Sequence, residues 1–478
     1  MEEILAGNSL VAIGQALSER RLSACEVVGW YLKRAAMLND TGPRLNAIRE
    51  LATDALEAAR RADEELAAGI WRGPLHGIPV LVKDNILAIG MNAAAGAMAL
   101  KGFRPRRDAT VVTRLRAAGA IIIGKTNLTE FADYVSDVMP SGFSGAGGEV
   151  KNPHGLAPYG RGLGSSVGSA AAVAARLVPI AIGSETQNSI QTPSCVSSVY
   201  GFKPSVGMVS RAGIVPLVPS QDSPGAIAGS IEDLALLLSV IAGADSADTA
   251  SLEMPQELFR PLKLREPATI RIGVPRRAMA DRPDFATVMA PFEATLLRLS
   301  KAGVTIVDPC DLPSAEQLQD VRSSVFRTEF KAALNTFLRD HDHPCGIDSL
   351  AALIRWNEAH AESIPYGQSL LLAAEATVGL DDPRYRADRA RDLVLSRSAG
   401  IDAAVAASGA DALIAPLTAA AKCTGKAGAP VLAIPVGLDG VGMPFGVTLY
   451  ASKGRDRHLL DVGAAISAII GERHLPNV

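Results

Sequence analysis

Cysteine is scarce in this chain, and its few residues are widely spaced. The 478 residues include five cysteines that no short spacing pairs: Cys25, Cys195, Cys310, Cys345 and Cys423. A disulfide framework normally uses an even number of cysteines, and disulfides persist in oxidising compartments. The cysteine pattern therefore argues against a disulfide-rich secreted protein and predicts a reducing compartment.

The chain also lacks an excess of charge of either sign. It has 47 basic and 50 acidic residues, which gives a formal net charge of -3. A protein that binds nucleic acid usually presents a basic face that releases counterions from phosphates. The charge balance therefore argues against a nucleic-acid partner.

Long apolar runs are missing near the N-terminus. The first residues, MEEILAGNSLVAIGQALSERR, carry acids where a signal peptide carries basic residues. Their apolar stretches are too short and too interrupted to span a bilayer. The sequence therefore predicts a cytoplasmic protein with no membrane partner.

Histidine is present only seven times, and none of these residues lies in a serine motif. His341-Asp342-His343, followed by Cys345, brings residue types that bind metals close together. No second cluster of such residues completes a metal site. The sequence predicts no bound metal, and it leaves the role of a general base to another residue type.

Apolar residues make up 48% of the chain, and their spacing changes along it. They recur at helical spacing from residue 9 to about 72, whereas later segments alternate between short apolar runs and helical stretches, as in an α/β sheet flanked by helices. The predicted strands are 77–83, 120–125, 178–184, 269–275, 304–308, 412–416, 431–437 and 445–452. The predicted helices are 109–119, 169–177, 231–243, most of 311–408, and a helix from about Leu459.

No linker, repeat or low-complexity tract divides the chain. Because apolar strands occur near both ends, we predict a single domain over residues 1–478, with one sheet to which strands from the whole chain contribute. The core motifs lie in 73–230, and a variable, mostly helical region at about 245–410 is expected to select the substrate. Ser230 and Asp233 predict a capping box at the start of helix 231–243.

Lys83 ends the apolar run 77–83, where burial would strip water from its ammonium group. Desolvation favours the neutral amine and lowers the pKa of a lysine. A neutral amine near pH 7 is a usable general base. The alternative is a lysine at a strand end that reaches water or pairs with Asp84.

Ser165 lies in GLGSSVGS (162–169), directly before the predicted helix 169–177. Glycines before a helix N-terminus are compatible with a phosphate or dinucleotide cradle. That fingerprint requires a preceding strand, and KNPHGLAPYGR before it does not have the character of a strand. The Lys-Ser/Thr pair of a P-loop is also missing. The sequence therefore predicts no nucleotide cofactor.

Ser189 lies in GSETQNSIQTPS, in a polar turn directly after the predicted strand 178–184. Backbone N–H groups of such a turn can point at one spot and bind a developing oxyanion. A serine in the turn is inert until a base removes its proton. The alternative is a turn serine that satisfies its own backbone.

Together these segments resemble the amidase signature family over essentially the whole chain, most weakly in 245–410. GPLHGIPVLVKDN (73–85) is similar to the lysine strand of the family, and GSSVGSAAAVAARLVPIAIGSETQNSIQTPS (164–194) to its glycine- and serine-rich stretch. The spacing from Ser165 to Ser189 is that between the bridging and the nucleophilic serine. YGFKPSVGMVSRAGIVPLVPSQDSPG (200–225) and PVLAIPVGLDGVGMPFGVTLYAS (430–452) continue the resemblance.

The resemblance implies an α/β/α fold around a large mixed sheet and a relay of three side chains. Lys83 would take a proton from Ser165, and Ser165 would take one from Ser189. Ser189 would then attack the amide carbonyl to give an acyl-enzyme, without a cofactor or a metal. The implied oxyanion hole consists of the backbone N–H groups of Thr186, Gln187, Asn188 and Ser189.

The chain departs from the family pattern around the nucleophile. Gln187-Asn188 stands where the family usually has two glycines, and Gln191 stands where it commonly has an arginine. Asparagine is among the few residues that share the tolerance of glycine for positive φ, so the oxyanion hole could survive. We predict that Gln187 and Gln191 contact the substrate. Val167 and GAIAGS (225–230) also differ from the family pattern.

The segments KNPHG (151–155), SETQ (184–187) and SRAGIVP…SQD (210–222) are more similar to free-standing amidases, including peptide amidases, than to the amidotransferase subunit. We therefore predict an amidase that hydrolyses a small amide or an amidated peptide, and a homodimer is compatible with this prediction. The alternatives are a glutaminase subunit of an amidotransferase and a catalytically silent binding protein with the amidase fold.

Overall fold

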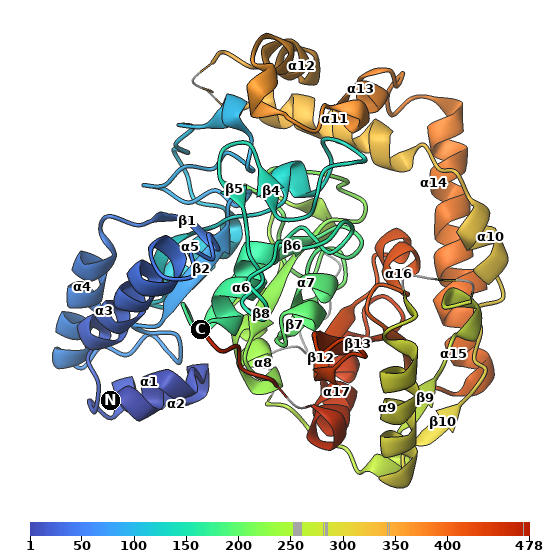
Figure 1. The fold of residues 1–478 in the computed structure, drawn as a ribbon, viewed down its shortest axis with the longest axis horizontal. Coiled ribbons are helices and arrows are strands. Elements are labelled where there is room, and N and C mark those ends of the chain that lie inside the picture. The colour runs from blue at the N-terminus through green and yellow to red at the C-terminus, as the bar shows by residue number, and fades with distance from the viewer. Residues whose placement is uncertain (252–260, 281, 283–284, 342, 344, 472) are drawn as a thin grey trace.

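The computed structural model describes residues 1–251, 261–280, 282, 285–341, 343, 345–471 and 473–478. Its centre is an 11-stranded sheet to which segments from both halves of the chain contribute (Figure 1). In spatial order the strands are β1 (Ile48–Leu51), β3 (Ile121–Thr126), β2 (Pro79–Lys83), β6 (Ile180–Glu185), β8 (Ser223–Ala228), β7 (Tyr200–Lys203), β12 (Val431–Leu438), β13 (Pro444–Tyr450), β11 (Ala412–Pro416), β9 (Arg271–Gly273) and β10 (Thr305–Val307).

The sheet is mixed. Strands β3 and β6 both run parallel to β2 between them, and β11 and β10 both run parallel to β9. The other ladders of this sheet are antiparallel. A large mixed sheet flanked by helices confirms the predicted fold class.

Each run predicted as a strand overlaps a strand of the sheet, but β1, β7 and β8 were missed. The two central strands β7 and β8, YGFK and SPGAIA, are buried throughout. Their glycines and the proline of β8 resemble turn residues in the sequence, whereas pairing with distant strands holds them extended. The segment 137–168, in which no strand was predicted, also contains a small ladder of β4 (Phe143–Ser144) and β5 (Gly148–Glu149).

Helices cover the sheet and its edges. Those outside the 311–408 region are α1 (Glu2–Gly7), α2 (Leu10–Ser18), α3 (Ala24–Arg34), α4 (Ala55–Ala67), α5 (Thr110–Ala117), α6 (Val167–Ala174), α7 (Gln191–Val196), α8 (Ile231–Ile241), α9 (Met289–Lys301), α16 (Ala421–Ala427) and α17 (Asp456–Ile470). Across the residues given above, no helix combines the length and the apolar character that a membrane span needs.

The predicted capping box at α8 is only half correct. Ser230 caps the helix, because its Oγ accepts a hydrogen bond from the Asp233 N–H (3.1 Å). The Asp233 carboxylate does not return to the Ser230 backbone. It accepts from the N–H groups of Leu10 (3.1 Å) and Val11 (3.2 Å) at the start of α2. The acid therefore joins two helices that are distant in the sequence.

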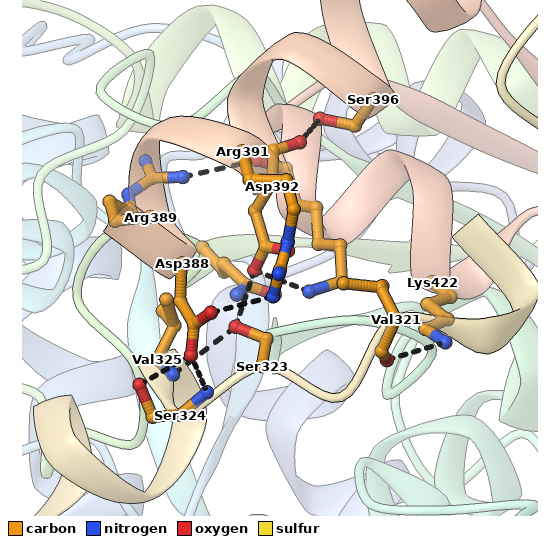
Figure 2. A network of polar contacts seen from close by, with 12 residues as sticks. Val321, Ser323, Ser324, Val325, Asp388, Arg389, Arg391, Asp392, Ser396 and Lys422 are labelled. Atoms are coloured by element: carbon orange, nitrogen blue, oxygen red, sulfur yellow. Dashed lines mark hydrogen bonds and ion pairs between the residues drawn. The ribbon is translucent and has the colours of Figure 1, made fainter. Parts of the chain in front are cut away.

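The region 311–408 is mostly helical, as predicted, and Figure 1 shows it above and beside the sheet. Its helices are α10 (Ala315–Asp320), α11 (Val325–Arg339), α12 (Leu350–Ala359), α13 (Ser369–Glu375), α14 (Pro383–Ser396) and α15 (Asp402–Ser408). Figure 2 shows polar contacts that join α14 to the segment before α11. There Asp388 accepts from the Ser324 N–H and Oγ–H (2.7 Å each), and Asp392 accepts from Ser323 Oγ (2.8 Å).

Candidate active site

Lys83 is the last residue of β2, and its side chain is fully buried. Because β2 pairs in parallel with β6, the end of β6 lies beside it. Lys83 Nζ donates to Ser165 Oγ (2.7 Å), to Ser184 Oγ (3.0 Å) and to the Ser184 carbonyl oxygen (3.1 Å). The amine is thus surrounded by hydroxyl and carbonyl oxygens.

Within the described residues, no carboxylate forms an ion pair with Lys83. Asp84, the alternative partner considered from the sequence, pairs instead with Arg49 (2.5 Å). Burial lowers the pKa of Lys83 to about 7, and more distant carboxylates oppose this shift only in part. A large fraction of the amine is therefore neutral near pH 7.

Ser165 lies in the loop that leads into α6 and is fully buried. Its carbonyl oxygen accepts from the Thr129 N–H (3.2 Å). A Cβ on the preceding Gly164 would lie 2.4 Å from Thr129 Oγ1, so only glycine fits before the serine. The segment 152–163 before it forms turns and part of an isolated bridge. The strand that a dinucleotide cradle needs at this point is therefore absent from the described segment, as predicted.

Ser189 follows β6 in the turn that leads into α7, and it is 4% exposed. Its carbonyl oxygen accepts from the Ser166 N–H (2.9 Å), which ties the turn to the neighbour of Ser165. Its hydroxyl has no hydrogen-bond partner among the described residues. The fold thus brings Lys83, Ser165 and Ser189 into one region, with a direct hydrogen bond between the first two.

The turn before Ser189 leaves its backbone donors open. The N–H groups of residues 186–189 have no acceptor within the described part of the chain. The Glu185 carboxylate holds the turn in place, because it accepts from the N–H groups of Ile190 (2.6 Å) and Gln191 (2.9 Å). Sequence reasoning gave Glu185 no role. Backbone N–H groups without an acceptor are what an oxyanion hole requires, and the role of these groups in one stays a prediction.

Gln187 and Asn188 occupy this turn without a glycine-like backbone, because neither has a positive φ. A negative φ is open to every L-residue, so the turn tolerates this pair in place of two glycines. Gln187 Nε2 donates to Gln221 Oε1 (3.2 Å), and Asn188 Nδ2 donates to the Gly162 carbonyl oxygen (2.8 Å). Both side chains thus brace the turn against neighbouring loops.

Gln191 lies on the inner side of the turn and is 1% exposed. Its Nε2 donates to Glu185 Oε1 and to the Gln187 carbonyl oxygen, both at 2.7 Å. The side chain therefore supports the turn from behind. Contact of Gln187 or Gln191 with a substrate stays a prediction.

Asp222 is a second residue to which sequence reasoning gave no role. Thr186 Oγ1 donates to one oxygen of its carboxylate (2.6 Å), and the N–H groups of Leu217 and Val218 donate to the other (2.9 Å each). Burial raises the pKa of Asp222, while these hydrogen bonds oppose the shift. The carboxylate joins the turn of Ser189 to the loop 217–222.

A cavity of about 860 Å³ adjoins this group of residues. Ser184 and Thr186 line it at the end of β6, the segment 211–217 lines a further part, and α11 contributes Glu329 and Phe337. The volume is within the range of small-molecule sites. Helix α11 belongs to the region that was predicted to select the substrate.

The two histidines of the sequence pattern His341-Asp342-His343 pack against aromatic rings, and His341 also lines the cavity. His341 stacks on Phe337 with ring centroids 4.4 Å apart, and the His343 ring lies 4.5 Å from that of Phe103. Asp342 is outside the described residues. Among the residues that are described, no group of three or more His, Cys, Asp or Glu side chains could hold a metal ion.

Comparison with known proteins gives a consistent result. The family model named Amidase matches residues 26–425. A probable amidase of Arabidopsis thaliana is 33% identical over 464 residues, which cover 94% of this chain and 87% of the relative. A glutamyl-tRNA(Gln) amidotransferase subunit of Aromatoleum aromaticum is 40% identical over 318 residues, which cover 64% of this chain and 61% of that relative.

Two solved structures are also similar over nearly the whole chain. The peptide amidase of Stenotrophomonas maltophilia has a TM-score of 0.90 and 38% sequence identity, and the match covers 98% of each chain. An amidase family protein of Bacillus anthracis has a TM-score of 0.89 and 29% identity, with 98% of this chain and 92% of that chain covered. The chain therefore belongs to the amidase family of hydrolases, which act on the C–N bonds of amides.

Proposed function

We propose that this protein is a serine amidase that hydrolyses a small carboxylic amide or an amidated peptide through Lys83, Ser165 and Ser189. The observation that carries the proposal is the 2.7 Å contact between the buried Lys83 amine and the Ser165 hydroxyl. A neutral amine can donate two hydrogen bonds and accept one. The two N–H groups of neutral Lys83 can donate to the carbonyl oxygen and Oγ of Ser184. The lone pair of the amine then remains to accept the proton of Ser165.

The proposed reaction begins with proton transfer through the relay. Lys83 takes the proton of Ser165 while Ser165 takes that of Ser189, and Ser189 Oγ bonds to the amide carbon. The developing oxyanion is bound by backbone N–H groups of residues 186–189. The relay then returns a proton to the amide nitrogen, the C–N bond breaks, and the amine or ammonia leaves. Water attacks the acyl-enzyme in the same way and releases the carboxylic acid.

A fluorophosphonate probe tests the proposal directly, because it reacts with activated serine nucleophiles. We expect one adduct by intact mass on the wild-type protein and none on Ser189→Ala. We also expect the wild-type protein to release ammonia from simple amides, and Ser189→Ala to lose essentially all of this turnover. Retained turnover in Ser189→Ala would contradict the assignment, and so would the absence of an adduct on the wild type.

The glutaminase component of an amidotransferase is the second candidate, because several relatives are named as amidotransferase subunits. The match to the protein of Aromatoleum aromaticum covers 64% of this chain, although that of Ralstonia pickettii covers 98% at 31% identity. At the same 98% coverage of this chain, the peptide amidase is 38% identical and the protein of Ralstonia pickettii is 31% identical, which favours a free-standing amidase. Purification from the native cell in complex with other amidotransferase subunits would favour the second candidate.

A further inference from the structure

Glu329 is a buried carboxylate in the wall of the cavity. It lies on α11, is 5% exposed, and lines the cavity together with Ser220 and Tyr385. Its Oε2 accepts from the Ser220 N–H (2.9 Å), and its Oε1 accepts from the Tyr385 hydroxyl (3.0 Å). Both donors are neutral, so they orient the carboxylate without neutralising it.

Glu329 has no ion pair among the described residues. The cavity wall also holds a partly buried cation, Arg211, but its guanidinium group forms an ion pair with Asp248. Arg211 Nε donates to Asp248 Oδ2 (2.8 Å), and Nη2 donates to Oδ1. Burying a charge without a partner is costly, so a cation that arrives with a ligand would gain from this position.

The rest of the cavity lining adds no excess of positive charge. Arg107 is the other arginine that lines it, and its side chain is exposed. Further carboxylates come from Asp108, Asp222 and Asp340. The lining therefore favours a cationic ligand over an anionic one.

We propose that Glu329 binds a primary ammonium group on the acyl part of the substrate, so that the enzyme prefers amides that carry such a group. This inference rests on the proposed amidase function. A carboxylate has about four acceptor positions, and two of those of Glu329 remain for N–H donors of an ammonium group. Because a primary amide releases only ammonia, the acyl part must supply the groups that reach the cavity wall.

A purely structural role is the competing explanation. Glu329 could simply fasten the segment at Ser220 to α11, and its loss would then affect all substrates alike. An ammonium-binding role predicts a loss confined largely to substrates with the cation. The ratio of the two activities therefore separates the explanations.

The test uses a series of unbranched ω-amino carboxamides of increasing chain length, each compared with its N-acetylated form. Their amines stay protonated near neutral pH, as a lysine does. Ammonia release should give the wild type a clear preference for at least one ammonium form. In Glu329→Gln this preference should fall by about tenfold to a hundredfold, mostly through KM, because charge-assisted hydrogen bonds are lost.

Two matched variants control for other effects. Tyr385→Phe removes a hydrogen bond to Glu329 but keeps its charge, so the preference for the ammonium form should persist. Asp340→Asn removes an exposed carboxylate that lines the same cavity just after α11, and should also keep the preference. An equal loss of preference in Tyr385→Phe or in Asp340→Asn would overturn the specific role of Glu329.

The measurement on the wild type tests the inference without any variant. Misfolding of the Glu329→Gln protein therefore cannot prevent the inference from being contradicted. If the wild type hydrolyses the N-acetylated amides and shows no preference for any ammonium form, the inference is wrong while the amidase proposal stands. If the wild type forms no fluorophosphonate adduct and hydrolyses neither form, the proposed function fails and the inference fails with it.

Discussion

Lys83 and Lys426 are both buried lysines, but they meet different partners in two regions of the molecule. Within the described part of the chain, the hydrogen bonds of Lys83, at the end of β2, go only to hydroxyl and carbonyl oxygens. Lys426, in α16, forms an ion pair with Asp392 of α14. Figure 2 shows Asp392 within a network of polar contacts. Burial lowers the pKa of both amines, and for Lys426 the carboxylate opposes the shift. The same residue type is thus a candidate base in one region and a structural tie in the other.

A lowered pKa does not by itself mark a base in this chain. Lys125 and Lys203 are also fully buried, and burial lowers the pKa of each to about 8. Their amines donate to the carbonyl oxygens of Ile86 and Ala429. Lys83 differs because its amine forms a hydrogen bond with the hydroxyl of Ser165. A hydroxyl, unlike a carbonyl oxygen, can both give up and accept a proton.

The largest expected effect is the loss of turnover when Lys83 is replaced. Lys83→Met keeps the length of the side chain but removes the proton acceptor, so kcat/KM should fall roughly 10³-fold or more. Ammonia release from an N-acetylated ω-amino carboxamide measures the loss. Lys203→Met is the matched control, since it removes a buried lysine without touching Ser165. An equal loss in the folded Lys203→Met protein would show that any buried lysine, and not the relay, sets the rate.

The second effect is on stability in the helical region. Asp392→Asn should lower the free energy of unfolding by about 3–5 kcal/mol, because it leaves the Lys426 ammonium buried without its counter-charge. Urea unfolding measures the change. Asp388→Asn, on the same helix, is the control. Its charged partners Arg384 and Arg391 are 74% and 47% exposed in their side chains. The amide oxygen of asparagine can still accept from Ser324, so a loss of about 1 kcal/mol or less is expected. Equal losses would contradict the structural role of the buried pair.

The difference between the two regions also explains what the sequence could predict. Lys83, Ser165 and Ser189 lie in segments with local signals: an apolar run, a glycine-rich loop and a turn after a strand. Glu185 and Asp222 were missed because their carboxylates accept from backbone N–H groups of nearby residues. Every residue except proline carries such a group, so no residue type in the sequence indicates the contact.

The same limit applies to the fold. The apolar runs bounded by Gly or Pro located most strands, because that pattern is local. The central strands β7 and β8 were missed, since tertiary pairing, and not their composition, makes them strands. The helices of 311–408 were predicted, but nothing in their sequence indicated that α11 brings Glu329 to the cavity.

The third effect is the dependence of activity on pH. In the proposed relay the active form of Lys83 is the neutral amine, and burial lowers its pKa to about 7. Below that pH, kcat/KM should fall about tenfold for each pH unit, and above about pH 8 it should level off. An N-acetylated amide is the right substrate, because it does not titrate in this range. A flat profile between about pH 6 and 9 would count against Lys83 as the base.

The smallest effect is on the pH dependence of stability, and it follows from the same pKa. The folded-state pKa of Lys83 is about 7 and the ordinary value is 10.5, so between these values the unfolded chain binds more protons. Stability of the wild type should therefore rise with pH in this window, by about 1 kcal/mol per pH unit from this residue. The Lys83→Met variant lacks this contribution to the pH dependence of stability. The Lys426→Met variant instead removes an amine whose charged form is favoured by Asp392. Urea unfolding at about pH 7, 8 and 9 should show the difference between wild type and Lys83→Met changing steadily. If that difference in the free energy of unfolding stays constant across the series, Lys83 keeps its proton in the folded protein. The proposed difference between Lys83 as a base and Lys426 as a structural cation would then be wrong.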